Sequence, residues 1–202
     1  MTVPSVFPSR AWQGALATVL LFLCPTTGRA HDAFGDLGPF YASFLHPLAD
    51  PLQAALLVGV AAFLAGRQLA FARVAVPLFL AMSSLAAFAL AYGHAPGEPG
   101  SLVPYAVLSI GLAAVVPKVV KPRIVAFALV AATGAMTGLA PGVPGEVMML
   151  QWLSGTVCGI AALVLLAWFA LDAVARHLTS IAPKVAGSWV AAVGILVVAL
   201  SV

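Results

Sequence analysis

Residues 29–51 read RAHDAFGDLGPFYASFLHPLADP, and they separate a short leader from a chain that is apolar almost to its end. The stretch holds two of the four histidines and three of the six acidic residues. Imidazole and carboxylate groups bind metal ions and carry protons. A cluster of these groups at the mouth of an apolar bundle predicts a protein that handles metal ions or protons.

The composition places the chain in a membrane. Of its 202 residues, 63% are hydrophobic and 7% are charged, and the mean hydropathy is +1.11. Soluble domains carry about 25% charged residues, so this chain has too few charges to cover a water-facing surface. The net charge of +3 does not indicate nucleic-acid binding, because basic residues lie in short loops between apolar runs, which fits membrane orientation better. We expect an all-α, polytopic membrane helix bundle.

Residues 1–30 have the pattern of a cleavable signal peptide. Arg10 precedes a short apolar stretch over residues 15–24, and small residues occupy positions 28 and 30. A basic region, an apolar core and a small-residue cleavage site follow each other in this order in signal peptides. Cleavage after Ala30 would make His31 the first residue of the mature chain. An uncleaved membrane anchor is the alternative.

Six apolar segments follow the leader, and each is roughly long enough to cross about 30 Å of hydrocarbon at about 1.5 Å per residue. The segments cover residues 48–66, 74–92, 102–120, 124–140, 147–171 and 185–202. We therefore expect a signal peptide (1–30), an exterior N-terminal segment (31–47) and a six-helix transmembrane domain (48–202).

Pairs of glycines four residues apart put small residues on one face of the fourth and fifth segments, where helix backbones can approach closely. The pairs are Gly134 with Gly138 and Gly155 with Gly159. Packing within the monomer and a dimer contact are both compatible with these faces.

Loop charges predict the orientation. The first, third and fifth loops between the segments contain Lys or Arg, whereas the second and fourth contain none. Loops that carry Lys and Arg stay in the cytoplasm. We therefore expect a multi-pass protein of the inner (cytoplasmic) membrane, with the mature N-terminus and the C-terminus on the exterior, periplasmic side.

On this topology the polar residues of the exterior face are the candidate metal ligands. The primary candidates are His31, Asp32, Asp36, His46 and Asp50, and the secondary candidates are Gln53, His94 and Glu98. Imidazole suits Ni, Zn, Cu and Fe, and carboxylate extends the choice to harder ions. After cleavage, the α-amine and imidazole of His31 could chelate one metal ion. A solvated loop without a metal is the alternative for His94 and Glu98.

His46 and Pro47 are expected to begin the first span, because proline is favoured at the first helical position. Asp50 would then share a helix face with His46. The pair is either a capture site for a cation, or an interfacial histidine beside an acid favoured by the helix dipole. Gln53 either extends the polar path inward or makes an interhelical hydrogen bond. We expect residues 33–40 to form a turn-rich loop in a re-entrant or surface-hugging segment, with a plain tether as the alternative.

No motif of a soluble enzyme is present. The sequence has no P-loop, no HExxH, no GxSxG and no CxxC. We expect a protein that is not an enzyme, that holds no permanently bound cofactor and that does not drive transport with ATP by itself.

The signal peptide, His31, the segment HDAFGDLGPFYASFLHPLADP and the six spans together resemble the HupE/UreJ family. That resemblance implies a small membrane protein associated with hydrogenase or urease, acting as a secondary nickel permease or an accessory protein. Members typically carry a His-Pro that opens the first span, followed within about a turn by an Asp-His pair. His46 and Pro47 match the opening, whereas the Asp-His pair falls on Leu52 and Gln53.

Two functions follow as expectations. The first is uptake or delivery of a divalent transition metal, with Ni²⁺ as the leading ion, the lipid bilayer as surroundings and metalloenzyme maturation proteins as partners. The second is a non-transporting accessory protein that assists maturation of a hydrogenase or urease, which the scarcity of polar residues in mid-membrane favours. A membrane enzyme or a proton-coupled exchanger that uses Asp and His at the exterior face is a weaker third alternative.

Overall fold

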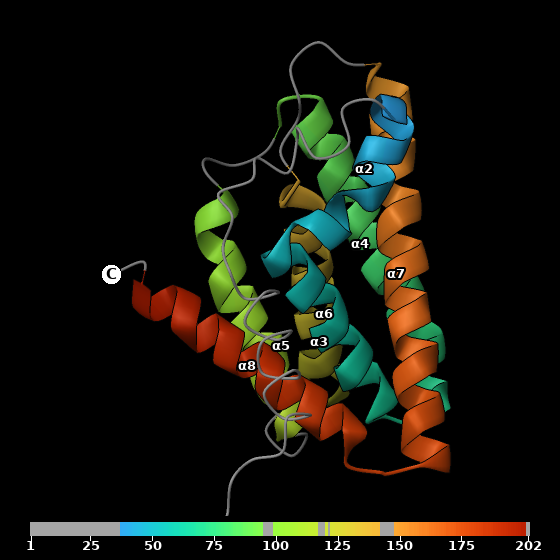
Figure 1. Cartoon of the computed structure of the whole chain (residues 1–202), viewed down its shortest axis with the longest axis vertical. Helices are drawn as coiled ribbons and strands as arrows, with labels where there is room; N and C mark the ends of the chain where they lie inside the picture. The colour runs from blue at the N-terminus through green and yellow to red at the C-terminus, as the bar shows by residue number, and fades with distance from the viewer. Residues whose placement is uncertain (1–36, 95–98, 117–119, 121, 142–147, 201–202) are drawn as a thin grey trace, which may run out of the picture.

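The computed structural model describes residues 37–94, 99–116, 120, 122–141 and 148–200. This part of the chain is helical and contains no β-strand, which confirms the all-α class (Figure 1). The helices are α2 (Gly38–Ala49), α3 (Pro51–Ala65), α4 (Leu69–Ala91), the 3₁₀ turn η2 (Pro99–Leu102), α5 (Val103–Val115), α6 (Arg123–Leu139), α7 (Met149–His177) and α8 (Ala182–Leu200).

Each of the six predicted segments contains a helix, but the helices differ in length. Three of them (α4, α7 and α8) are long and apolar enough to cross a membrane, and α2 with α3 makes a fourth if the bent pair counts as one span. The helices α5 and α6 are shorter apolar helices. At about 1.5 Å per residue, the 13 residues of α5 extend about 20 Å, short of the roughly 30 Å of a hydrocarbon core.

The predicted start of the first helix is wrong. Helix α2 begins at Gly38, inside the expected turn-rich loop, and runs through His46 and Pro47. A second helix, α3, begins at Pro51 after a bend of 73°. His46 and Asp50 therefore do not share a helix face, because Asp50 is the residue between the two helices. The boundary expected at residue 47 falls inside α2.

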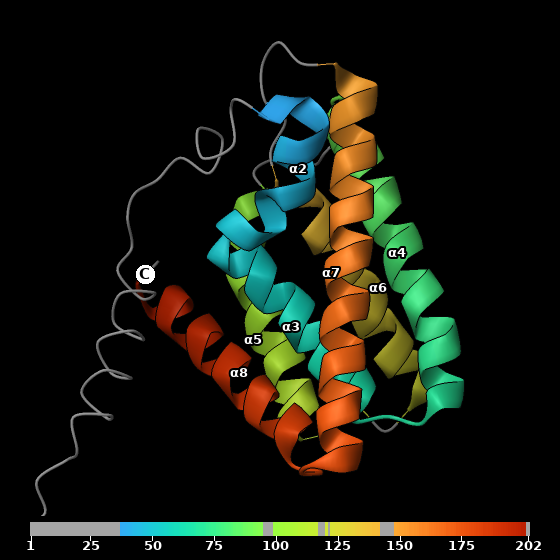
Figure 2. The same ribbon diagram turned by 45° about the vertical axis from the view of Figure 1, so that its right-hand side comes forward.

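The bundle is built around α3. Leu56, Leu57, Val60, Phe63 and their neighbours on α3 are buried, because α5, α7 and α8 pack on different sides of this helix (Figures 1 and 2). A helix that is apolar all round is typical of a buried core position. Helix α2 packs on α7, α4 packs on α6, and α5 packs on α8.

Glycines allow these helix pairs to approach backbone to backbone. A Cβ atom on Gly155 or Gly159 of α7 would collide with the α2 carbonyls of Phe40 or Phe44. The Gly134 and Gly138 pair of α6 contacts the backbone of α4 in the same way. In lipid, where apolar burial provides little drive for association, such close packing is a main source of stability. Both glycine faces therefore serve packing within one chain.

The outer surface of the bundle is apolar. Large apolar side chains are exposed on several helices, with 77% exposure at Ile124, 79% at Leu150 and 78% at Leu200. Continuous apolar surface of this kind is not maintained in water. The protein is therefore a membrane protein, as the composition predicts.

Candidate functional site

The break between α2 and α3 is the central feature of the candidate site. Pro51 lacks a backbone N–H, and the residue before a proline is driven out of the helical conformation. Asp50 accordingly has φ −94° and ψ 109° and ends α2. Its carboxylate then caps α3, because Oδ1 accepts hydrogen bonds from the backbone N–H groups of Leu52 at 2.9 Å and Gln53 at 3.3 Å. The two helices therefore meet at a residue that stabilises the second of them.

A buried polar chain crosses this break. The Nδ1 atom of His46, in the last turn of α2, lies 3.0 Å from Oε1 of Gln53, in the first turn of α3. The amide nitrogen of Gln53 donates to the backbone carbonyl of Thr137 on α6 at 2.9 Å. Gln53 is completely buried and His46 is 9% exposed. The chain therefore ties α2, α3 and α6 together where α2 turns into α3.

Pro141 explains why Gln53 bonds to the carbonyl of Thr137. In a regular helix that carbonyl would accept from the N–H group four residues later, but that position holds a proline, which has no N–H. A buried carbonyl without a donor is costly, so a side-chain donor from another helix is favoured. Gln53 supplies the donor across 84 residues of sequence.

The same bond defines the orientation of the amide and the tautomer of His46. Because the amide nitrogen of Gln53 donates to a carbonyl, its oxygen faces the imidazole. An amide oxygen only accepts, so Nδ1 of His46 carries the proton. In the neutral ring the lone pair then resides on Nε2, which is the atom that can bind a metal ion or accept a proton. Histidines that bind metals are commonly oriented by such a hydrogen bond at the other ring nitrogen.

Prolines also alter the backbone around His46. Pro47 and Pro51 cannot donate the helical hydrogen bonds that the carbonyls of Ser43 and Pro47 would otherwise receive. Ser43, whose hydroxyl bonds to Pro39 and Phe40, is buried on the face that contacts α7. The C-terminal end of α2 thus gathers carbonyl oxygens and the negative end of a helix dipole beside an imidazole.

The structure brings together only part of the predicted ligand set. His46, Asp50 and Gln53 lie at the break, and the alternative of an interhelical hydrogen bond for Gln53 is the observed one. His94 is exposed after α4. His31, Asp32, Asp36 and Glu98 lie outside the described residues. Among the residues that are described, no group of three or more His, Cys, Asp or Glu side chains is close enough to hold a metal ion.

Two buried polar features were not expected from the sequence. The carbonyl of Thr137 could have been found from Pro141 four residues later. Thr156 on α7 is 1% exposed, and within the described part of the chain its hydroxyl has no hydrogen-bond partner. Other buried hydroxyls bond to carbonyls of their own helix, as those of Ser83 and Thr133 do. No local sequence signal distinguishes Thr156 from them.

Near the C-terminal end of α7, Asp172 and Arg176 form an ion pair four residues apart. The guanidinium side chain is largely exposed, with a relative accessibility of 69%, so water screens the pair and its contribution to stability is small. The pair is consistent with a structural role at the end of the helix.

Comparison with protein families supports the resemblance seen in the sequence. The family model for the HupE / UreJ protein matches residues 19–197. This range contains every helix from α2 to α7 and all but the last residues of α8. Comparison with curated proteins and with solved structures gave no match. The match covers most of the chain, and the protein therefore belongs to the HupE/UreJ family.

Proposed function

We propose that this protein takes up or delivers a transition-metal ion, with Ni²⁺ as the leading candidate, and that the break between α2 and α3 is where the ion first enters the bundle. The observation that carries the proposal is the His46–Gln53 contact across the break. Discontinuous helices form the substrate sites of many secondary transporters, because helix ends offer dipoles and carbonyls to an ion.

The chemistry around His46 supports a cation. The tautomer imposed by Gln53 places the imidazole lone pair on Nε2, and imidazole is a good ligand for Ni²⁺. The end of α2 adds carbonyl oxygens whose helical donors are replaced by prolines. The carboxylate of Asp50, which caps α3, contributes negative charge at the break itself. The remaining ligands would come from His31, Asp32 and Asp36, which directly precede α2 in the sequence.

Gln53 occupies the position where the family pattern has histidine. Because residues 46 and 53 are in contact here, a second imidazole at position 53 would place two ring nitrogens side by side. An amide is a weaker ligand for transition metals than imidazole. We therefore expect this chain to hold the ion less tightly than a member with the complete pattern.

The orientation proposed from the loops places the break outside. The described Lys and Arg residues follow α3, begin α4, α6 and α8, or end α7, and these helix ends lie together at the lower end in Figures 1 and 2. This grouping supports a cytoplasmic lower end and an exterior position for α2. A signal peptide cleaved after Ala30 and six crossings of the inner membrane complete the proposed topology.

A non-transporting accessory role is the second candidate, and a specific observation favours it. The helices α3, α4, α5 and α6 contain no His, Asp or Glu. A divalent ion that crosses the membrane requires ligands along its route, so the bundle offers few groups beyond the break. A protein that captures the ion and presents it to a maturation partner would need none.

The two candidates separate in liposomes that contain only the purified full-length protein. We expect Ni²⁺ influx, followed by an internal dye, that is strongly reduced in His46→Ala and retained in His94→Ala, an exposed histidine after α4. Equal influx in both variants would contradict the site. Binding of Ni²⁺ that depends on His46, without any influx, would assign the accessory role instead.

A gain-of-function variant tests the same site from the other direction. The double substitution Leu52→Asp with Gln53→His restores the family pattern at the break. We expect it to bind Ni²⁺ more tightly than the unchanged chain, because an imidazole replaces an amide next to His46. Affinity equal to or lower than that of the unchanged chain would contradict the inferred role of position 53.

A further inference from the structure

A basic cavity lies at the end of the bundle opposite to the α2–α3 break. It has a volume of about 250 Å³ and is formed by α3, α5, α7 and α8, with Phe63, Arg67, Ala114, Ser180, Pro183 and Lys184 among its lining residues. Pockets for drug-sized ligands usually have volumes of about 300–1,000 Å³. The cavity therefore suits a small group, such as a phosphate with its nearest substituents.

Among the residues that the structure describes, two cations and no acid line this cavity. The guanidinium of Arg67 is held by a hydrogen bond from Nη2 to the carbonyl of Val120 at 3.3 Å, and it lies 4.6 Å from the centre of the Phe63 ring. Burial lowers the pKa of Arg67, but an arginine remains charged at neutral pH. Lys184 is exposed and belongs to no ion pair within the described part of the chain.

The start of α8 adds to the positive potential. The helix begins at Ala182, so the positive end of its dipole lies beside the cavity. Pro183 has no N–H, and the N–H groups of Ala182 and Val185 donate to the carbonyls of Thr179 and Ile181, so Lys184 supplies the charge at this turn. Lys184 lies in that first turn, and Ser180, two residues before the helix, lines the cavity. The structure describes two acids, and neither lines the cavity: Asp172 is paired with Arg176, and Asp50 lies at the far end of α3. Because Arg67 and Lys184 line the cavity, an anion is the ligand that it favours.

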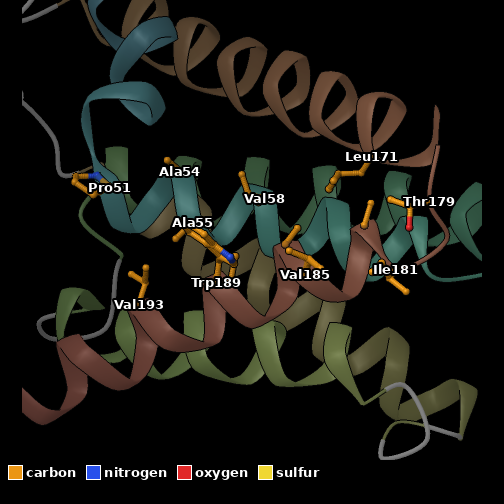
Figure 3. Close-up of a pocket in the computed structure, with 13 residues that line it drawn as sticks. Pro51, Ala54, Ala55, Val58, Leu171, Thr179, Ile181, Val185, Trp189 and Val193 are labelled. Carbon is orange, nitrogen blue, oxygen red and sulfur yellow. The ribbon is translucent and has the colours of Figure 1, made fainter. Parts of the chain in front are cut away.

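An apolar groove of about 760 Å³ reaches the same end of the bundle. Figure 3 shows side chains of α3 and α8 along this groove, from Pro51 and Val193 at one end to Thr179 and Ile181 at the other. Thr179 and Ile181 flank Ser180, which lines the basic cavity. A ligand with a charged head and an apolar chain therefore matches two adjacent surfaces.

We propose that the cavity binds the phosphate of an anionic phospholipid, with Arg67 and Lys184 as its cations and an acyl chain in the groove between α3 and α8. On the proposed orientation this end faces the cytoplasmic leaflet, where anionic lipids attract basic residues. The site is separate from the α2–α3 break, so its test does not depend on metal binding.

The test is the thermal unfolding of the full-length protein in a neutral detergent, titrated with short-chain phosphatidylglycerol. Phosphatidylcholine, glycerol phosphate and inorganic phosphate are titrated in parallel. We expect a saturable rise in Tm with phosphatidylglycerol alone, and an apparent affinity about five-fold weaker in Lys184→Gln, since each cation near an anionic lipid surface contributes of the order of a five-fold factor. Arg73→Gln, a cation near the start of α4 outside the cavity, is the matched control.

A second pair of variants separates charge from packing at Arg67. Arg67→Lys keeps the charge and should retain most of the response, whereas Arg67→Gln should lose it. An unchanged affinity in Lys184→Gln would overturn the cavity as the site. A full response to inorganic phosphate or glycerol phosphate would assign a soluble anion and overturn the lipid. An equal response to phosphatidylcholine would show that negative charge plays no part.

Discussion

Replacing Gln53 with leucine should loosen the junction of α2, α3 and α6. Gln53 is completely buried, and its amide makes one hydrogen bond to His46 and one to the carbonyl of Thr137. Leucine has a similar size but can make neither bond. The imidazole N–H and the Thr137 carbonyl then lose their partner together, and Pro141 prevents a helical donor from replacing it.

The expected loss follows from the number of bonds and their surroundings. In water-soluble proteins each buried group left unsatisfied costs about 1–3 kcal/mol. Interhelical hydrogen bonds in membranes contribute about 0.6 kcal/mol on average and about 1.7 at most, because the unfolded chain in the membrane also finds partners. The membrane values apply here, so two bonds predict that Gln53→Leu lowers the free energy of unfolding by roughly 1–3 kcal/mol.

A double-mutant cycle measures the His46–Gln53 bond separately. Unfolding of the purified protein in mixed micelles is followed by circular dichroism for His46→Ala, Gln53→Leu and the combined variant. We expect a coupling energy of roughly 0.6–1.7 kcal/mol. The matched control pairs His46→Ala with Ser109→Ala, because Ser109 is exposed on α5 and bonds only to its own helix.

Two results would refute this reasoning. A coupling energy indistinguishable from that of the control pair would show that the imidazole and the amide do not interact. A Gln53→Leu variant as stable as the unchanged protein would show that the Thr137 carbonyl has another donor. Either result would also remove the basis for assigning the proton of His46 to Nδ1.

Three further substitutions test particular contacts by the same unfolding measurement. Thr156→Val should stabilise the protein by about 1 kcal/mol, because it removes a buried hydroxyl that has no partner in the described part of the chain. Thr137→Val, which removes a hydroxyl that is hydrogen-bonded, should not stabilise it, and destabilisation by Thr156→Val would indicate a bound water or ion at the Thr156 hydroxyl. Gly159→Ala should destabilise the protein by about 1–3 kcal/mol, because its Cβ would collide with the α2 backbone. Gly66→Ala should be nearly neutral, because a Cβ there meets nothing closer than 3.6 Å, and equal effects of the two substitutions would argue against the close packing of α2 on α7. Asp50→Ala should lower the stability by about 1 kcal/mol, because it removes the side-chain cap of α3. Asp50→Asn can still cap the helix and should keep most of that stability, so a similar loss in both variants would point to the charge of Asp50 and not to its capping bonds.

The positions of most helices were predictable because they depend on local apolar length. The segment expected at 124–140 corresponds closely to α6, and the one expected at 74–92 lies almost wholly within α4, which begins earlier, at Leu69. The start of the first helix was not predictable, although both of the prolines that bear on it, Pro47 and Pro51, are visible in the sequence. Pro47 and Pro51 each suit the first position of a helix. The packing of Phe40 and Phe44 on the glycines of α7 favours a helix that continues through Pro47, so Pro51 becomes the start of the next one.

Composition was sufficient to identify a membrane helix bundle, because the bilayer acts on every segment according to its apolar length. The orientation that the flanking charges indicate stays a prediction. The sequence also marked His46, Asp50 and Gln53 as polar residues in an unusual place. The contacts among these residues depended on the folded bundle, since the bond from Gln53 to Thr137 joins helices separated by 84 residues. Such a bond forms only when the folded bundle has set α3 and α6 side by side, and no local pattern in the chain specifies that arrangement.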